Sequence, residues 1–534
     1  MKLYTKRFLQ LFIVLISSLI LSKNLFAQST VKLKRQPNIL FAIADDQSYP
    51  HTSAYGQKIY HTPNFDRVAS KGVLFTNAFV AAPQCSPSRA AILTGRQIWQ
   101  LEEAGTHASL FPKKYPVVTN TLESAGYFLG FTGKPWDPGN FKAAGWTRNP
   151  VGPEYNNKHV VKAPTVGISN IDYVANFADF LSEKPADKPF FFWFGSHEPH
   201  RNYEPGSGAA AGLQTKDMLV PAFLPDNQNI RNDLLDYALE IEYFDKQLGK
   251  MLDMLEAAGE LDNTIVVVTA DNGMPFPYAK ANLQEYGIHV PLAICGPKVN
   301  GQNRTVTDMV SLIDLAPTFL DLASAEHFKG ITGKSLMPIL KSKKSGNIDT
   351  SRHYVFTGRE RHSHARPDNV GYPARAIRSQ EYLYIENLKP DRWPAGDPAP
   401  SNPVAVVSES GMKGIFEGYD DIDDSPTKSW MIQNKNTWPV LFKLGFEKRN
   451  QEQLFNIKKD PNCLNDLAAN TQFDAIRNQL KKKLEETLVA QSDPRMTGNG
   501  AIFDSYPRFG LMRPYEGFKE RGKYNPAFQK KSSN

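Results

Sequence analysis

A thiol, a proline and two arginines lie within residues 84–96, which read Gln-Cys-Ser-Pro-Ser-Arg-Ala-Ala-Ile-Leu-Thr-Gly-Arg. Arg89 follows Cys85 by four residues. If a helix begins near Pro87 or Ser88, residue 85 lies at its amino end, where backbone N–H groups and the helix dipole favour an anion. The alternative interpretation is a loop that enters a helix, with a buried cysteine and arginines on the surface.

Polar side chains also follow three short apolar runs, each typical of a strand buried on both faces of a sheet. The runs and the groups after them are residues 37–44 with Asp45 and Asp46, residues 189–195 with His197 and His200, and residues 264–270 with Asp271 and Asn272. In open α/β sheets, ligands bind at the carboxyl ends of the strands. The sequence therefore predicts that these groups meet at one edge of a sheet.

The four residues that follow the first and third strands supply only hard oxygen ligands, which favours Ca²⁺ or Mg²⁺ over zinc. Adjacent carboxylates such as Asp45 and Asp46 repel each other unless a cation or several donors compensate them. The alternatives are solvated acids at a strand exit and, for a single histidine after a strand, a purely structural role.

Other patterns place the surrounding elements. Residues 62–72 read as a helix with an early proline and a glycine just past its end. Residues 232–258 carry apolar side chains at helical spacing. Residues 376–385 alternate like a hairpin, and a helix is predicted at 473–488. The tail beyond Ser492 is predicted to be irregular.

Cys-x-Pro-Ser-Arg followed by Leu-Thr-Gly-Arg resembles the signature of the type I sulfatases. The resemblance extends over roughly residues 36–490, and within it residues 453–462 resemble the family's closing strand and turn. The run at 271–283, Asp-Asn-Gly-Met-Pro-Phe-Pro-Tyr-Ala-Lys-Ala-Asn-Leu, is similar to the heparan N-sulfatase branch, in which an arginine stands at the position of Lys280. The resemblance implies an α/β, alkaline-phosphatase-like fold: a large mixed sheet sandwiched by helices, and a smaller C-terminal α+β subdomain with an antiparallel sheet and a helix.

In this family the cysteine is oxidised to formylglycine, so the resemblance implies that Cys85 becomes the nucleophile. It implies catalytic roles for Cys85, Arg89, Lys134, His197, Lys280 and Asp271. It implies a Ca²⁺ site, with Mg²⁺ as the alternative, formed by Asp45, Asp46, Cys85, Asp271 and Asn272. Thr132-Gly133-Lys134 matches the family's Gly-Lys, although Pro135-Trp136-Asp137 follows where many members have a nearby histidine.

Six arginines and three histidines lie between residues 352 and 378. A solvated basic loop is one interpretation. The other is a subsite for an anionic sugar chain, because guanidinium groups bind anionic oxygens through paired hydrogen bonds. The substrate-binding candidates are His200, Arg359, His362, His364 and Arg366.

The composition limits the remaining possibilities. With 534 residues, the chain is long enough for one large domain and a smaller one. Residues 1–27 read as a signal peptide whose apolar run, about 14 residues, is short of the roughly 20 needed to span a bilayer. Its four basic residues reduce the formal net charge from +7 to +3 when removed, which implies no general affinity for nucleic acid. Cys295 and Cys463 could pair or remain buried thiols.

We therefore predict a signal peptide at 1–27, a catalytic domain at 36–372, a smaller subdomain at 373–490 and a tail at 491–534. The predicted activity is hydrolysis of sulfate esters of a sulfated carbohydrate such as ulvan or a glycosaminoglycan, in the periplasm or outside the cell, without a membrane anchor. A formylglycine-generating or anaerobic sulfatase-maturing enzyme is the implied partner. The alternatives are a sulfamidase, a phosphodiesterase or phosphonate monoester hydrolase, and an unmatured homologue that binds sulfated glycan.

Overall fold

The computed structural model describes residues 36–399, 405–407, 413–415 and 417–510. The chain divides into a unit of residues 1–36 and a compact unit of residues 37–534. The predicted signal peptide lies outside the described residues, and so does the tail beyond residue 510. Among the described residues, no helix combines the length and the apolar character needed to cross a membrane.

A seven-stranded mixed sheet forms the centre of the compact unit, in the order β4-β5-β1-β6-β7-β2-β8. Four of its seven strands, β4, β5, β1 and β6, run parallel to one another, whereas β7 is antiparallel to β6 and to β2. The bounds are β1 Asn38–Ala44, β2 Val73–Phe75, β4 Phe128–Gly133, β5 Phe190–Gly195, β6 Thr264–Ala270, β7 Leu292–Cys295 and β8 Arg304–Val306. The strands predicted at 37–44, 189–195 and 264–270 are thus confirmed as neighbours.

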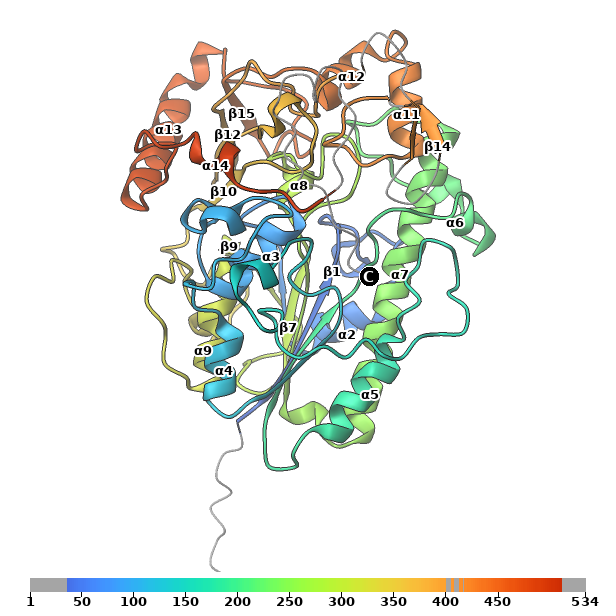
Figure 1. Cartoon of the computed structure of the whole chain (residues 1–534), viewed down its shortest axis with the longest axis vertical. Coiled ribbons are helices and arrows are strands. Elements are labelled where there is room, and N and C mark those ends of the chain that lie inside the picture. Colours follow the sequence, from blue (N-terminus) through green and yellow to red (C-terminus); the bar gives the residue numbers. More distant parts are fainter. Residues whose placement is uncertain (1–35, 400–404, 408–412, 416, 511–534) are drawn as a thin grey trace, which may run out of the picture. The chain divides into compact units, whose positions relative to one another are not determined.

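Helices cover both faces of this sheet, with α3, α4 and α9 on one side and α2, α5 and α7 on the other (Figure 1). Successive side chains of a strand point to opposite faces, and the aromatic core follows this rule. Phe191 of β5 packs against Phe319 of α9, whereas its neighbours Phe190 and Phe192 pack against Phe180 of α5. The strands therefore need apolar residues at every position, which is why they read as continuous apolar runs.

The α-helices are α2 Pro63–Lys71, α3 Cys85–Thr94, α4 Val118–Ser124, α5 Tyr173–Glu183, α6 Ser207–Ala210, α7 Gln228–Ala257, α8 Glu285–Ile288, α9 Leu315–Ala323, α10 Met337–Lys341, α11 Pro426–Gln433, α12 Pro439–Phe446, α13 Asp474–Ala490 and α14 Ile502–Ser505. Helix α7 begins four residues before the predicted start, because the Asn227 side chain caps it by accepting from the N–H groups of Asn229 and Ile230.

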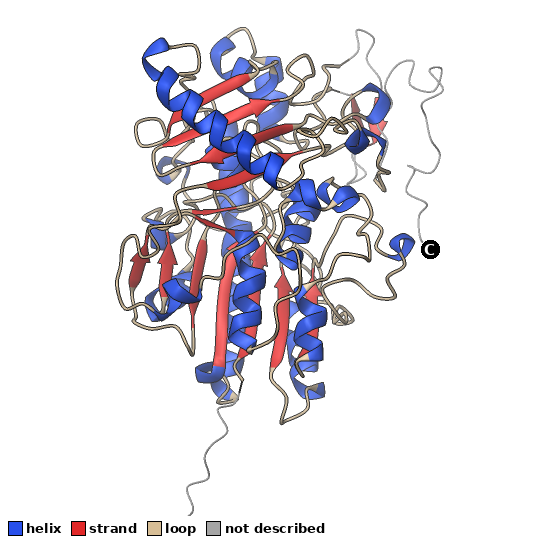
Figure 2. Cartoon of the chain, turned by 90° about the vertical axis from the view of Figure 1, so that its left-hand side faces the viewer, coloured by secondary structure: helices blue, strands red, loops and turns tan. Residues whose placement is uncertain are grey.

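A second, antiparallel sheet of four strands has the order β10-β11-β12-β15. Helix α13 lies across it (Figure 2). The bounds are β10 Val355–Arg359, β11 Ala374–Arg378, β12 Tyr382–Asn387 and β15 Glu452–Asn456. The predicted hairpin and closing strand are confirmed as β11, β12 and β15. Strand β10 belongs to this sheet although it precedes the predicted subdomain boundary at residue 373.

Two short pairs complete the strands, β3 Ala78–Phe79 with β9 Val310–Ser311, and β13 Ala405–Val407 with β14 Lys413–Ile415. The three cysteines are all buried and free. Cys295 and Cys463 therefore remain separate thiols, which resolves the alternative that the sequence left open.

Two glycines bring the ends of β4 and β5 together. Gly133 and Gly195 are paired in the register. A Cβ atom on Gly133 would lie 1.9 Å from the carbonyl oxygen of Gly195, and Gly133 has a φ of +76° that other residues rarely adopt. This close approach lets the Lys134 N–H donate to the Gly195 carbonyl at 2.6 Å, which fixes where both strands deliver their next residues.

Candidate active site

The predicted acidic groups meet at the carboxyl edge of the parallel strands. Asp45 and Asp46 follow β1, and Asp271 and Asn272 follow the adjacent β6. The Asp46 N–H donates to Oδ1 of Asp271 at 3.1 Å, and Nδ2 of Asn272 donates to Oδ1 of Asp46 at 2.6 Å. All four residues are at most 1 % exposed, so the carboxylates of the three aspartates are removed from water and need compensating charge.

Cys85 lies at the first position of α3, facing these acids. The helix begins two residues before the expected Pro87, and Cys85 remains at its amino end as predicted. Its Sγ is 3.3 Å from Oδ1 of Asp45 and 3.9 Å from Oδ1 of Asp46. Burial, and next the Asp45 carboxylate, raise the pKa of the unmodified Cys85 thiol well above its ordinary value, so the thiol is protonated at neutral pH.

The same residues fit a hard metal ion. Asp45, Asp46, Cys85 and Asp271 each offer one ligand atom, and these atoms lie within 4.8 Å of one another. Oδ1 of Asn272 is buried and has no hydrogen-bond partner, although a buried amide oxygen is costly to leave unsatisfied. A cation next to this oxygen satisfies it and compensates the adjacent carboxylates. Because the ligands are mainly oxygens, the site suits Ca²⁺ or Mg²⁺.

Arg89 lies below the cysteine, fully buried, and does not line the cavity. Its Nε donates to Oδ2 of Asp271 at 2.7 Å, and its Nη1 donates to the carbonyls of Lys134 and Pro135 at 2.6 and 3.0 Å. Nη2 lies 3.7 Å from Oδ1 of Asp45. Arg89 thus ties three strand ends to α3. Burial, and then Asp45, raise the pKa of Asp271 to about 7 despite this arginine.

Two lysines stand beside Cys85, each held by one of the acids. Lys134 donates to Oδ2 of Asp45, and Lys280 donates to Oδ2 of Asp46 at 2.7 Å and to Oδ2 of Asp423 at 2.9 Å. Burial opposes their charge, but Asp45 raises the pKa of Lys134 and Asp423 with Asp46 raises that of Lys280. Both side chains therefore remain cationic while lining the cavity.

The segment after β5 supplies two histidines. His197 and His200 both line the cavity, and Nε2 of His200 is 3.8 Å from Oδ2 of Asp46. Burial and the cationic Lys134 lower the pKa of His197 to about 4, so its imidazole is neutral at pH 7. The backbone N–H of His197 donates to the Tyr173 hydroxyl at 3.1 Å, which anchors the segment to α5.

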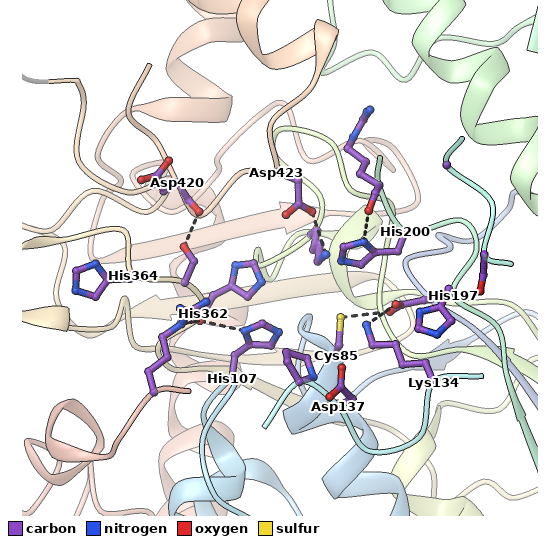
Figure 3. Close-up of a pocket in the computed structure, with 18 residues that line it drawn as sticks. Cys85, His107, Lys134, Asp137, His197, His200, His362, His364, Asp420 and Asp423 are labelled. Atoms are coloured by element: carbon purple, nitrogen blue, oxygen red, sulfur yellow. Dashed lines mark hydrogen bonds and ion pairs between the residues drawn. The ribbon is translucent and has the colours of Figure 1, made fainter. Parts of the chain in front are cut away.

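The cavity above these groups has a volume of about 470 Å³, which suits a ligand of sugar size. Figure 3 shows Cys85, Lys134, His197 and His200 on one side of it and His364 with Asp420 on the opposite side. Of the predicted site residues, the structure places Asp45, Cys85, Lys134, His197, His200, Lys280, His362 and His364 on its wall. Asp46, Arg89, Asp271 and Asn272 lie beneath the wall.

The predicted role of Arg359 and Arg366 as substrate contacts requires correction. Neither lines the cavity, and both donate to Oδ2 of Asp421, at 2.7 and 2.5 Å. Both also donate to the Pro394 carbonyl. A buried guanidinium needs a carboxylate or carbonyl partner, and here the chain supplies both. The two arginines therefore hold the loop that contains Asp421.

The alternative of a solvated basic loop is also wrong. All six arginines between residues 352 and 378 are at most 5 % exposed. Apart from Arg361, which donates to backbone carbonyls, each one pairs with a carboxylate of another segment. These pairs are Arg352 with Asp314, Arg359 and Arg366 with Asp421, Arg375 with Glu360 and Asp493, and Arg378 with Glu285.

Several wall residues were not predicted from the sequence. Asp423 reaches Lys280 from the loop before α11, His107 comes from the loop after α3, and Arg508 comes from the segment after α14. The four acids among residues 420–424 are the one signal that could have indicated partners for the arginines and for Lys280. Nothing in the sequence near Arg508 distinguishes it from other arginines of the tail.

The sheet order, the helices on both faces and the smaller antiparallel sheet place the protein in the class with an alkaline-phosphatase-like fold. The structure resembles the phosphonate monoester hydrolase of Agrobacterium radiobacter with a TM-score of 0.59 and 18% identity, over 86% of this chain and 97% of that one. It also resembles a protein solved in complex with its substrate D-glucosamine-2-N,6-O-disulfate, with a TM-score of 0.57 and 21% identity, over 86% and 99%.

The chain belongs to the sulfatase family, because the sequence model of the family described as "Sulfatase" matches residues 37–325. It is therefore a sulfuric ester hydrolase. A second family model, described as "N-sulphoglucosamine sulphohydrolase, C-terminal", matches residues 276–397. An ulvan-active sulfatase of Formosa agariphila is 26% identical over 477 residues, covering 86% of this chain and 82% of the relative. Human N-sulphoglucosamine sulphohydrolase is 29% identical over 402 residues, covering 66% and 74%.

Proposed function

We propose that the protein is an exported sulfatase that hydrolyses sulfate esters of a sulfated carbohydrate, with Cys85 matured to formylglycine. The observation that carries the proposal is the position of Cys85. Its side chain lies at the start of α3 and lines a sugar-sized cavity, next to oxygen ligands that also bind two lysines of the same cavity wall. A buried structural cysteine has no need of any of these neighbours.

Two groups complete the chemistry. Oxidation of Cys85 by a sulfatase-maturing enzyme would supply the formylglycine aldehyde, and addition of water would give its hydrate. The two oxygens on one carbon of the hydrate would provide both a nucleophile and a way to release the bound sulfate. Asp45, Asp46, residue 85, Asp271 and Asn272 would hold a Ca²⁺, which would supply positive charge that lowers the pKa of the nucleophile and neutralises sulfate.

The chain's own side chains bind and orient the sulfate group. Lys134 and Lys280 present ammonium groups to its oxygens and stabilise the charge that develops on them. His197, on the same wall, donates a hydrogen bond to the leaving oxygen or to the sulfate. Arg89 binds Asp271 and the Lys134 carbonyl, so we assign it a positioning role in place of the catalytic role that the resemblance implies.

The substrate class rests on relatives and on the cavity. The curated relatives are named for ulvan, for N-sulphoglucosamine and for N-acetylglucosamine 6-sulfate, all of them sulfated sugars. The cavity is rich in histidines and carboxylates, groups that bind sugar hydroxyls. We propose an O-sulfate of such a glycan, processed in the periplasm or outside the cell after removal of the segment predicted as a signal peptide.

A sulfamidase is the second candidate. Two observations favour it: the match of residues 276–397 to the N-sulphoglucosamine sulphohydrolase C-terminal description, and the human relative of that name. The two functions differ in whether the bond that breaks joins sulfur to oxygen or to nitrogen. Incubating the protein with N-acetylglucosamine 6-sulfate and separately with N-sulfoglucosamine, and measuring free sulfate, distinguishes them.

The proposal is tested by the mass of the Cys85 peptide from protein made in a host that matures sulfatases. Conversion of cysteine to formylglycine lowers the peptide mass by about 18 Da. We expect this loss together with sulfate release from a sulfated sugar. An unmodified cysteine with no sulfate released contradicts the mechanism and supports the glycan-binding alternative.

A further inference from the structure

The imidazole of His197 lines the cavity without a side chain that orients it (Figure 3). In the part of the chain that the structure describes, neither ring nitrogen of His197 has a hydrogen-bond partner. Histidines that act on a reacting group are commonly held by a third group. At this site, the direction of the imidazole therefore depends on what holds the backbone around residue 197.

Tyr173, the first residue of α5, binds this backbone through its hydroxyl. The hydroxyl accepts from the His197 N–H at 3.1 Å and donates to Oε2 of Glu198 at 2.9 Å. Tyr173 is fully buried, and its ring packs against Phe194 of β5 with 5.2 Å between the ring centroids. The hydroxyl is therefore a fixed acceptor, because its proton is committed to Glu198 and its lone pair is presented to His197.

Glu198 is a buried carboxylate that is compensated by hydrogen bonds rather than by a cation. The residue is 1 % exposed, and among the described residues it forms no ion pair. Oε1 accepts from the Ser169 N–H at 2.8 Å, and Oε2 accepts from the hydroxyls of Tyr173 and Ser196. An apolar side chain would fill the same space without the cost of burying a charge. The carboxylate therefore serves the three donors that it binds.

These donors belong to segments that form the active site. Ser169 lines the cavity itself, and the other two donors adjoin or bind His197. The backbone of Glu198 adds a fourth link, because its carbonyl accepts from the Asp45 N–H at 3.1 Å. One buried residue thus joins the histidine segment to the cavity wall and to the first acid after β1.

The turn that follows His197 is closed by further hydrogen bonds. The His200 N–H donates to the His197 carbonyl at 3.0 Å, and the Tyr203 hydroxyl donates to the Pro199 carbonyl at 2.6 Å. Both backbone groups of His197 are therefore bound, its carbonyl by the turn and its N–H by Tyr173. The contact at the N–H is made by a side chain, so a single substitution can remove it and leave the backbone in place.

We propose that Tyr173 and Glu198 are positioning residues, which hold the His197 imidazole toward the leaving oxygen or the sulfate group. Glu198 orients the Tyr173 hydroxyl, and this hydroxyl fixes the His197 backbone. The inference rests on the proposed function, because positioning has an effect only if His197 acts on the substrate. Neither Tyr173 nor Glu198 lines the cavity, so their effect on the reaction must pass through His197.

The test uses full-length matured protein and the variants Tyr173→Phe and Glu198→Gln, each alone and combined with His197→Ala. Tyr127→Phe is the matched control, since it removes another buried tyrosine hydroxyl, which donates to the Pro37 carbonyl at 2.9 Å outside the cavity. The probes are N-acetylglucosamine 6-sulfate, N-sulfoglucosamine and ulvan oligosaccharides. For each probe that is cleaved, kcat and KM are measured separately.

We expect His197→Ala to lower kcat by about 100-fold or more, because it removes a donor to the reacting group. Tyr173→Phe and Glu198→Gln lower kcat by about 10-fold and leave KM within about threefold, since they loosen an orientation without removing a binding group. In the His197→Ala background, the same two substitutions change kcat by no more than about twofold. Tyr127→Phe matches the wild type.

The comparison of the two backgrounds decides between positioning and a merely structural role. A structural residue lowers kcat by the same factor with and without the imidazole, and that result overturns the proposal. Wild-type kcat in Tyr173→Phe and Glu198→Gln proteins whose melting curves show them folded overturns it as well. If His197→Ala itself retains kcat within about threefold, the proposed role of His197 fails, and the positioning role fails with it.

A measurement without substrate tests the contact itself. Hydrogen exchange of the backbone amides reports how firmly a segment is held. We expect Tyr173→Phe to speed exchange in residues 194–200 by about 5- to 10-fold, because the His197 N–H loses its acceptor. Exchange in β6, residues 264–270, stays unchanged, as does exchange in residues 194–200 of Tyr127→Phe.

This second measurement separates the inference from the proposed function. Faster exchange confined to residues 194–200, with no probe cleaved, supports the contact while the proposed hydrolysis fails. Equal acceleration in residues 264–270, or none in residues 194–200, contradicts the positioning role whether or not a probe is cleaved.

Discussion

The cluster around Cys85 and the arginine-rich stretch from residue 352 to 378 both bury many charged groups, but they use them differently. In the stretch, the arginines are matched with carboxylates or carbonyls of the same chain, and Arg359 and Arg366 do not reach the cavity. Around Cys85, the lysines are held by carboxylates yet still line the cavity, and Asn272 retains an unsatisfied oxygen. A buried charge points to function when its partners leave it facing a space that a ligand can fill.

The largest expected effect tests the first region. Cys85→Ala removes the proposed nucleophile and lowers sulfate release by about four orders of magnitude or more, because the remaining groups only bind and polarise. The free energy of unfolding changes by only about 1 kcal/mol, since a small side chain is shortened. Sulfate release measured by ion chromatography, with a melting curve, checks both. Activity within tenfold of the wild type would refute the role of Cys85.

Asp421→Asn tests the second region. Without the carboxylate, the buried Arg359 and Arg366 are uncompensated, and we expect a loss of about 3–5 kcal/mol in the free energy of unfolding at pH 7. Chemical denaturation measures it. Sulfate release per folded molecule remains close to that of the wild type, because none of the three residues lines the cavity.

The pH dependence of this difference follows from the pKa of Asp421. Burial alone would raise it, but Arg366 and Arg359 hold it well below its usual value. A depressed pKa in the folded state stabilises the protein above the unfolded value of about 3.9, and the stabilisation is lost as pH falls below it. The difference in unfolding free energy between wild type and Asp421→Asn is therefore constant from pH 7 to about pH 5 and becomes smaller at lower pH. A difference in unfolding free energy that grows in acid would contradict the ion pairs of Asp421 with Arg359 and Arg366.

A smaller change in unfolding free energy is expected when Ca²⁺ binds to the proposed metal site. At a Ca²⁺ concentration of 100 times Kd, binding to the folded state alone stabilises by about 2.7 kcal/mol, which raises the melting temperature. Asn272→Ala and Asp46→Asn remove ligands and weaken this response, whereas Asp226→Asn, on an exposed carboxylate outside the cluster, leaves it intact. Melting curves with and without a chelator measure it. An unchanged melting temperature with both Ca²⁺ and Mg²⁺ would exclude the site.

The smallest change is expected at an exposed ion pair, which serves as the reference for the buried ion pairs of Asp421. Asp226 pairs with Arg231 at 2.6 Å, much as Asp421 pairs with Arg359, but its side chain is 57 % exposed. Solvent screening limits such pairs, so we expect Asp226→Asn to cost no more than about 1 kcal/mol of unfolding free energy. Chemical denaturation under the same conditions as for Asp421→Asn measures it. Equal losses of unfolding free energy in the two variants would mean that burial does not determine how much these ion pairs stabilise the protein.

The elements that carry the acids and the thiol follow from local patterns in the sequence. Short continuous apolar runs such as those before Asp45 and Asp271 are typical of strands buried on both faces, and parallel strands bring their carboxyl ends to one edge. The signature around Cys85 is equally local, because the start of a helix is decided by neighbouring residues. For these reasons the three strands and the residues that follow them were predictable.

Only the tertiary structure decided which charges face the cavity. Arg359 and Arg366 find Asp421 at separations of 62 and 55 residues, and Arg361 binds carbonyls more than 140 residues away. Arg508 and Asp423 reach the wall from segments with no catalytic signature. A sequence shows how many cations it contains, but whether each is neutralised depends on which carboxylate the packing of distant segments brings within hydrogen-bond distance.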